Sequence, residues 1–582
     1  MHSLKIFYRI CLIITIALAM TLGALLLASH TGLDAATLTA RTAINCADVT
    51  EIPQAECQAI LDLYNNTDGP NWSDSPANNW NMTTTPCTNW SGVGCSSGHV
   101  IAITRTNMAL SGTLPVSLGD LANLQSLNLQ YNQLTGTILP GLSSLTDLSV
   151  LNLDGNELTG AIPPELGDLA NLQYLSLYHN HLTGAIPPEL GDLTNLQYLG
   201  LYYNHLTGTI PSELGNLANL QQLSLHINQL SGTIPQKLGN LANLQSLSLY
   251  DNQLSGAIPP ELGTLAKLQI LNLHVNQLSG TIPSKLGNLT NLTQLFLFDN
   301  QLSGVIPPEL GNLANLQYLG LFHNHLTGTI PLELGTLANL WLLDLSDNQL
   351  NGTLPPELRG LTNLRTLNLS SNHLTSTIPP ELNDLPYLTQ LILNSNTLSG
   401  AIPPELGNLS HLYRLELSGN QLTGAIPFSL TQLTGLNDAN LAYNGLWTQD
   451  QGIRAFLNDK DPDWADTQTV PPAAISVTWL TDNSAQVSWD PIRYTQDGGH
   501  YRVYYSFTPG GPYTPAISVA ADKTASSYVV ENLTPETTTY FVVTAFTPAH
   551  INNSNPITST FSNEVALVAG RHCIFLPLMI RN

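Results

Sequence analysis

Leucine and isoleucine recur with a period of 24 residues through most of the chain. Between residues 112 and 423 there are thirteen full units without insertion, followed by a partial fourteenth. Alternating leucines such as Leu127 and Leu129 predict a short strand whose inward face they form. Asn128 and Gln130 are expected to point outward. A fixed period of this length predicts a solenoid, because one unit cannot bury its leucines alone.

The other positions of the unit predict its corners. The asparagine after the strand recurs from Asn132 to Asn444, which predicts an internal ladder that binds buried turn amides. The Gly-x-Ile-Pro stretch predicts an extended corner, and the Pro-Pro-Glu-Leu-Gly stretch predicts a 3-10 turn on the outer face. The glycine that sets the phase is replaced once, by Ser376.

These residues resemble the plant-type leucine-rich repeat, written LxxLxxLxLxxNxLxGxIPxxLGx. Ectodomains of plant receptor kinases, polygalacturonase-inhibiting proteins and exported bacterial proteins carry this repeat. The resemblance implies an α/β solenoid with a parallel β-sheet on its concave face and 3-10 turns on its convex face. It does not identify a ligand, because members of the family bind very different ones.

The ends of the repeat array have patterns of their own. Residues 41–111 are expected to form an N-terminal cap, and their CTNWSGVGC stretch resembles the end of plant-type caps. The solenoid is then assigned to residues 112–447. Residues 448–470 are expected to form a C-terminal cap and a linker, with a helix at 452–464.

A different pattern follows the linker. Short alternating segments between residues 471 and 569 predict an all-β sandwich. Leu533 and Tyr540, with Trp489 earlier, resemble the tyrosine corner of a fibronectin type III domain, which has an immunoglobulin-like fold. The combination of modules favours an exported bacterial protein. The tail, residues 570–582, resembles short C-terminal tails of such proteins, although an ordinary terminus explains it equally well.

The first segment and the charge limit the location and the partners. Lys5 and Arg9 precede an apolar run, so residues 1–40 predict a signal peptide or an uncleaved anchor. We therefore expect a secreted or cell-surface protein. Seventeen basic against 41 acidic residues give a net charge of −24, which disfavours nucleic acid and, apart from that anchor, a membrane as partner.

Export permits disulfides. Four cysteines fall within fifty residues and allow three pairings, of which Cys46–Cys57 and Cys87–Cys95 close the shortest loops. Cys573 is either a free thiol or an intermolecular link, and Cys11 lies in the signal segment.

Enzyme signatures are absent from the sequence. It contains no H-E-x-x-H and no G-x-x-x-x-G-K-[ST] motif. Repeated glutamates such as Glu165 and Glu189 are expected on a solvated ridge, without the distinct environments that separate the pKa values of an acid–base pair. We therefore expect no catalysis, no cofactor and no metal.

Aromatic and histidine side chains gather at outward positions in one part of the array, and Gly200 and Gly320 are expected to leave room between them. This stripe predicts a ligand surface. Two alternatives are rings that only stabilise adjacent strands and rings copied by recent duplication. Its histidines predict pH sensitivity between about 5 and 7.5. The candidate residues are Tyr174, Tyr178, His179, Tyr198, Tyr202, Tyr203, His226, Tyr250, His274, Phe296, Phe298, Tyr318, Phe322, His323 and Trp341.

The functional hypothesis is an exported, non-enzymatic recognition protein whose concave face binds a protein, a peptide or a carbohydrate. A structural spacer or adhesin is one alternative, and an inhibitor of a secreted enzyme is another. The sequence leaves the oligomeric state open.

Overall fold

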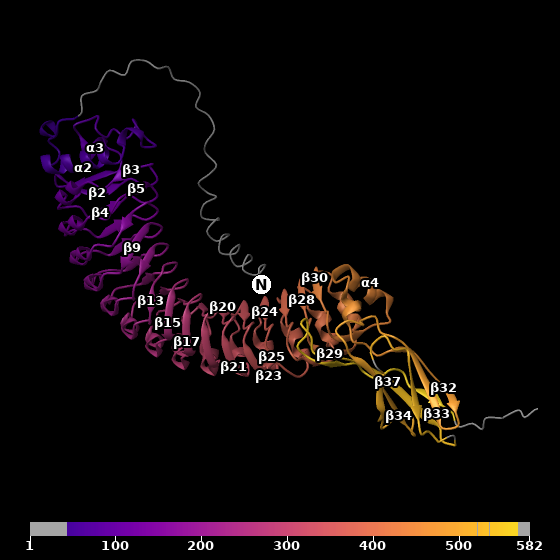
Figure 1. The fold of residues 1–582 in the computed structure, drawn as a ribbon. Helices are drawn as coiled ribbons and strands as arrows, with labels where there is room; N and C mark the ends of the chain where they lie inside the picture. The colour runs from indigo at the N-terminus through magenta and orange to yellow at the C-terminus, as the bar shows by residue number, and fades with distance from the viewer. Residues whose placement is uncertain (1–43, 521, 535, 569–582) are drawn as a thin grey trace, which may run out of the picture.

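A computed structural model describes residues 44–520, 522–534 and 536–568. A long curved solenoid leads from the N-terminal cap to helix α4, and a smaller β-rich module follows it (Figure 1). The segment 1–40, the tail 570–582, Cys11 and Cys573 lie outside the described residues, so the expectations for them stay predictions.

The main sheet holds sixteen strands within the described residues, in sequence order. The pair β1–β2 is antiparallel and the later neighbours are parallel in register, so that Tyr198 lies beside Tyr174. The strands are β1 (Val93–Ser96), β2 (His99–Thr104), β4 (Ser126–Asn128), β6 (Val150–Asn152), β8 (Tyr174–Ser176), β10 (Tyr198–Gly200), β12 (Gln222–Ser224), β14 (Ser246–Ser248), β16 (Ile270–Asn272), β18 (Gln294–Phe296), β20 (Tyr318–Gly320), β22 (Leu342–Asp344), β24 (Thr366–Asn368), β26 (Gln390–Ile392), β28 (Arg414–Glu416) and β30 (Asp438–Asn440).

Short side strands form smaller parallel sheets along a second face, and 3-10 turns from η3 (Val116–Asp120) to η16 (Phe428–Gln432) complete the units. In Figure 1 the side strands β21, β23 and β25 lie on the opposite edge from β20, β24 and β28. The side strands are β3 (Ser111–Thr113), β5 (Gln133–Thr135), β7 (Thr159–Gly160), β9 (His181–Ala185), β11 (His205–Thr207), β13 (Ser231–Gly232), β15 (Gln253–Ala257), β17 (Gln277–Thr281), β19 (Gln301–Val305), β21 (His325–Gly328), β23 (Gln349–Gly352), β25 (His373–Leu374), β27 (Ser399–Gly400), β29 (Gln421–Ala425) and β31 (Gly445–Trp447).

The inward leucines and the asparagine ladder form the core, as the repeat predicts. Leu127 and Leu129 are fully buried. Asn156 donates to the carbonyls of Leu129 and Leu153 at 3.1 and 3.0 Å. Its Oδ1 accepts from the amide of Leu134 at 3.0 Å. Each ladder asparagine thus satisfies buried backbone groups of its own unit and of the preceding unit.

The corner after each side strand needs a left-handed backbone. Gly352 has a φ of 76°, and Ser376, the single departure from glycine at this position, has a φ of 74°. Ser376 therefore adopts the conformation that its sister units assign to glycine.

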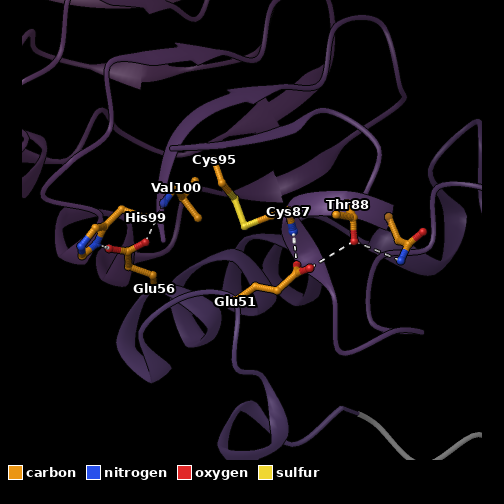
Figure 2. The surroundings of a disulfide bond; sticks show 8 residues. Glu51, Glu56, Cys87, Thr88, Cys95, His99 and Val100 are labelled. Atoms are coloured by element: carbon orange, nitrogen blue, oxygen red, sulfur yellow. Dashed lines mark hydrogen bonds and ion pairs between the residues drawn. A yellow bond between two sulfur atoms is a disulfide. The ribbon is translucent and has the colours of Figure 1, made fainter. Parts of the chain in front are cut away.

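The N-terminal cap contains η1 (Cys46–Asp48), α2 (Gln54–Asn66), η2 (Gly69–Asn71) and α3 (Pro86–Asn89). The disulfides Cys46–Cys57 and Cys87–Cys95 join its segments, in the pairing that the shortest loops favour. Two carboxylates hold the beginning of the cap to its end (Figure 2). Glu51 accepts from the amide of Cys87 at 2.9 Å, and Glu56 accepts from the amide of Val100 at 2.7 Å.

Helix α4 (Gln451–Lys460) and η17 (Trp464–Thr467) cover the other end of the solenoid. Trp464 is 3 % exposed and packs on the leucine core. The ladder runs beyond Asn444 into this cap, because Gln468 accepts from the amide of Leu446 at 2.9 Å and donates to the carbonyl of Leu441 at 2.8 Å.

The last module has two antiparallel sheets that share a core around Trp489, Tyr501 and Phe541. One sheet has the order β32-β33-β36, and the other has β35-β34-β37-β38 with β39 also pairing with β37. The bounds are β32 (Ala473–Thr481), β33 (Ser484–Asp490), β34 (His500–Ser506), β35 (Thr514–Ala520), β36 (Ser527–Glu531), β37 (Thr539–Thr547), β38 (Ile557–Thr558) and β39 (Val565–Leu567).

The module is hydrogen-bonded to the end of the solenoid. Thr469, expected in a linker, is fully buried, and its hydroxyl lies 2.7 Å from that of Thr547. Asn553 donates to the carbonyls of Asn420 and Tyr443 at 2.9 and 3.0 Å. The side chain of Asn555 donates to the carbonyl of Asn396. The segment between the two modules is therefore part of an interface.

Candidate functional site

Seven aromatic side chains form a continuous stack on the outward face of the main sheet, which we call the ring stack. Each follows its strand by two residues, and parallel pairing brings successive units side by side. Neighbouring ring centroids are 4.2 to 4.3 Å apart, and neighbouring ring planes lie within 20° of parallel. The members are Tyr178, Tyr202, His226, Tyr250, His274, Phe298 and Phe322.

Stacking buries much of each ring. Phe298 is 9 % exposed, and the others of the stack are half-buried. An inner ring has a neighbour on both faces, so the stack presents ring edges to solvent. The groups that a ligand could contact are tyrosine hydroxyls, imidazole nitrogens and apolar ring edges.

The two histidines of the stack are neutral at physiological pH. Burial lowers the pKa of His226 and of His274 to about 3. The predicted charge change of this column between pH 5 and 7.5 is therefore wrong, because the rings on either side exclude water from the imidazoles.

Other candidates widen the ring stack on both sides. Tyr174 and Tyr198 stack with centroids 4.4 Å apart, and His179 and Tyr203 stack at 4.9 Å. The structure thus brings the sequence-predicted rings of the first half into three parallel columns.

Phe296 connects the columns in the second half. Its ring meets those of His274 and Phe298 edge-on, at 6.2 and 5.9 Å, and lies 6.2 Å from that of Tyr318. The Tyr318 ring in turn meets Trp341 edge-on at 5.7 Å. Phe296 thus joins the ring stack to Tyr318 and Trp341, and His323 is held by the carboxylate of Asp299.

The glycines do not leave empty space between the rings. A Cβ on Gly200 would lie 2.6 Å from the hydroxyl oxygen of Tyr198, and a Cβ on Gly320 would lie 2.9 Å from Cδ1 of Phe296. The expected room is filled, because a neighbouring ring lies over each glycine.

Two buried carboxylates that the sequence analysis missed lie at the ends of the ring stack. Asp154, one repeat before Tyr178, is 1 % exposed, and Asp344, near the last ring, is 3 % exposed. Burial raises the pKa of each to about 6. Asp344 accepts from the hydroxyl of Ser346 at 2.6 Å. The 24-residue phase places Asp154 in the stack column, and that signal was available in the sequence.

Family models match the repeats and their cap. A leucine-rich repeat region matches residues 123–305, a leucine rich repeat N-terminal domain matches 53–96, and single leucine rich repeats match 315–337, 339–361, 363–385, 387–409 and 411–433. The solved plant peptide hormone receptor RGFR1, in complex with RGF2, is 35 % identical with a TM-score of 0.53. The match covers 62 % of this chain and 68 % of that chain.

The chain belongs to the plant-type leucine-rich repeat family.

Two further solved leucine-rich repeat structures are similar. PEPR1 with AtPEP1 is 32 % identical with a TM-score of 0.56, over 68 % of this chain and 66 % of that chain. A TDR receptor is 30 % identical with a TM-score of 0.55, over 64 % of this chain and 67 % of that chain. Each of the three likenesses covers about two thirds of the receptor chain.

The part of the chain that the structure describes lacks two features. None of its helices is long and apolar enough to cross a bilayer. Its His, Cys, Asp and Glu side chains form no group of three or more that could hold a metal ion.

Proposed function

We propose that this leucine-rich repeat protein is a non-enzymatic recognition protein that binds an extended peptide segment along the ring stack. The observation that carries the proposal is the continuous stack itself, from Tyr178 to Phe322 on consecutive units. Apolar ring edges exclude water, and the interspersed hydroxyls and imidazoles supply hydrogen bonds, which is the mixture found at binding hot spots.

The ring geometry favours a peptide over a carbohydrate. A sugar ring stacks on an open aromatic face, and the inner rings from Tyr202 to Phe298 have neighbours on both faces. A peptide can instead pack side chains between ring edges while its backbone pairs with hydroxyls. Two similar structures, a plant peptide hormone receptor in complex with RGF2 and PEPR1 with AtPEP1, support the same choice.

We propose that the protein works outside the cell, as an exported bacterial type. The two disulfides of the described cap and the N-terminal signal pattern support an oxidising compartment. We also propose the domain limits 41–111, 112–447, 448–470 and 471–569, and the positions of the caps, the repeats and the two small sheets support them.

Residues 471–569 are proposed as a fibronectin type III module. The split of strands into β32-β33-β36 and β35-β34-β37-β38 over one core supports this assignment. Its role would be to hold the solenoid at a distance from an attachment point.

A displayed library of random peptides tests the function. The purified full chain is the target, and the double variant Tyr202→Ser/Tyr250→Ser is the counter-target. The proposal predicts a family of sequences enriched on the wild type and depleted on the variant. Equal enrichment on both proteins would favour the spacer alternative.

A further inference from the structure

Asp154 is a buried carboxylate with an unused oxygen. The residue is 1 % exposed and lies in the column of the ring stack, one repeat before Tyr178. Its Oδ2 accepts from the hydroxyl of Ser176 at 3.0 Å. Its Oδ1 is buried and has no hydrogen-bond partner among the described residues.

Five tyrosines gather around this carboxylate. Tyr131 and Tyr178 join their hydroxyls at 2.7 Å, and the rings of Tyr178 and Tyr202 stack. The rings of Tyr174 and Tyr198 stack beside them. Burial and the nearby Asp154 raise the pKa of Tyr174, Tyr178, Tyr198 and Tyr202, so their hydroxyls keep their protons.

No ion pair of the described residues includes Asp154. The titratable groups that interact with it are four of these tyrosines and His179, whose exposed ring stacks on Tyr203. The four are Tyr174, Tyr178, Tyr198 and Tyr202. A buried carboxylate without a cation is an unfavourable arrangement that a positive group would relieve.

We propose that Asp154 and its five tyrosines form a subsite for a cationic nitrogen group of the ligand, an alkylammonium or a guanidinium. The inference rests on the proposed function, because it names the chemistry of one end of the peptide. Asp154 supplies the charge, and the hydroxyls accept N–H bonds. The net charge of −24 favours the approach of a positive ligand.

In this proposal Tyr131 controls the access of the cation to Asp154. The Tyr131 ring is 48 % exposed and lies against Gly155, where a Cβ would be 2.5 Å from its Cδ1. Rotation of this ring breaks its bond to Tyr178 and exposes Asp154. The unused Oδ1 then accepts from the incoming nitrogen.

Small cations test the subsite without the natural ligand. Propylguanidinium and n-butylammonium chloride are titrated into the purified full chain, with sodium chloride adjusted to hold the ionic strength constant. Near-ultraviolet circular dichroism of tyrosine and calorimetry report binding. Asp154→Asn keeps the shape and removes the charge, whereas Asp347→Asn removes an exposed charge from the same face.

We expect saturable binding by the wild type and by Asp347→Asn, and a loss of at least tenfold in affinity for Asp154→Asn. Equal binding by Asp154→Asn, or no saturable binding by the wild type, overturns the subsite. Thermal unfolding of each variant verifies that it is folded.

Pairs of peptides show which group of the ligand is the cation. They also distinguish a failure of this inference from a failure of the proposed function. Comparing an arginine peptide with its citrulline analogue tests whether the cation is a side-chain guanidinium. Comparing a peptide with a free N-terminus and its acetylated form tests whether the cation is the terminal amine. If a selected peptide binds the wild type and Asp154→Asn equally but not Tyr202→Ser/Tyr250→Ser, the subsite is wrong and the function stands. If the small cations bind at Asp154 and no peptide is selected, the function is wrong and the subsite stands.

Discussion

Gln468 makes the hydrogen bonds of a ladder asparagine, one repeat of 24 residues after Asn444. Asn444 accepts from the amide of Leu422 at 3.0 Å, and Gln468 accepts from the amide of Leu446 at 2.9 Å. The cap therefore ends the solenoid by continuing its polar core with a longer side chain.

Gln468→Ala should loosen the C-terminal end of the solenoid. The change leaves the buried amide of Leu446 without its side-chain acceptor, at a cost of about 2 kcal/mol. Hydrogen exchange should accelerate in α4 and β31 and stay unchanged in the first repeats. Gln451→Ala, an exposed glutamine of the same cap, is the control and should leave the exchange unchanged. Equal protection in both variants would contradict this role.

The Cys87–Cys95 bridge should stabilise the N-terminal end of the solenoid. It closes a short loop over a separation of 8 residues in the cap. Its loss in Cys87→Ser/Cys95→Ser should cost about 2–4 kcal/mol by loop-closure entropy and open the first repeats before the rest. Non-reducing peptide mapping checks the bridge directly, and a free thiol at either cysteine would refute it.

The stacked histidines should make the fold sensitive to acid. Their folded-state pKa of about 3 lies below the ordinary value of 6.5, so the unfolded chain binds more protons between these values. The free energy of unfolding therefore falls as the pH drops below about 6.5. The variant His226→Phe/His274→Phe places at both positions the residue found at Phe298 and Phe322. It should remove this acid-dependent fall in the free energy of unfolding.

The comparison of the phenylalanine variant with the wild type isolates the histidines. Its advantage in free energy of unfolding should be larger at pH 5 than at pH 8 by roughly 2 kcal/mol or more. Asp154 and Asp344 act in the opposite sense between pH 6 and 4, because their pKa is raised, but they are present in both proteins. A pH-independent difference in urea unfolding would show that the imidazoles are not shielded.

Much of the fold can be predicted from the repeat, whereas much less of the candidate site can. The period fixes the inward leucines, the ladder and the positions of the rings, because each depends on local spacing. The neutral state of His226 depends on rings contributed by the units on either side. The cluster at Asp154 depends on how Tyr131 turns over Gly155, which the column pattern does not specify. Gln468 was in phase with the ladder and was missed because its residue type differs.

The junction of the two modules could not be anticipated either, since Asn553 and Asn555 belong to no periodic pattern. The variant Asn553→Ala/Asn555→Ala should free the last module from the solenoid, because three backbone carbonyls of the solenoid lose their side-chain donors. Small-angle scattering should show a broader distribution of particle dimensions. Asn552→Ala, an exposed neighbour, should leave the scattering of the wild type unchanged, and a rigid double variant would contradict the interface.

The central claim is that the ring stack is a ligand surface, and the affinity of a library-selected peptide tests it most directly. Calorimetry compares the wild type with Tyr202→Ser/Tyr250→Ser and with Tyr387→Ser/Tyr413→Ser, two exposed tyrosines outside the stack. The first variant loses stacking contacts worth about 0.5–1.5 kcal/mol each, which a solenoid with this leucine core should tolerate. We predict that it binds weaker by about 2 kcal/mol or more and that the second binds like the wild type. Equal affinity of all three proteins would contradict the account and leave the stack as a feature of sheet packing.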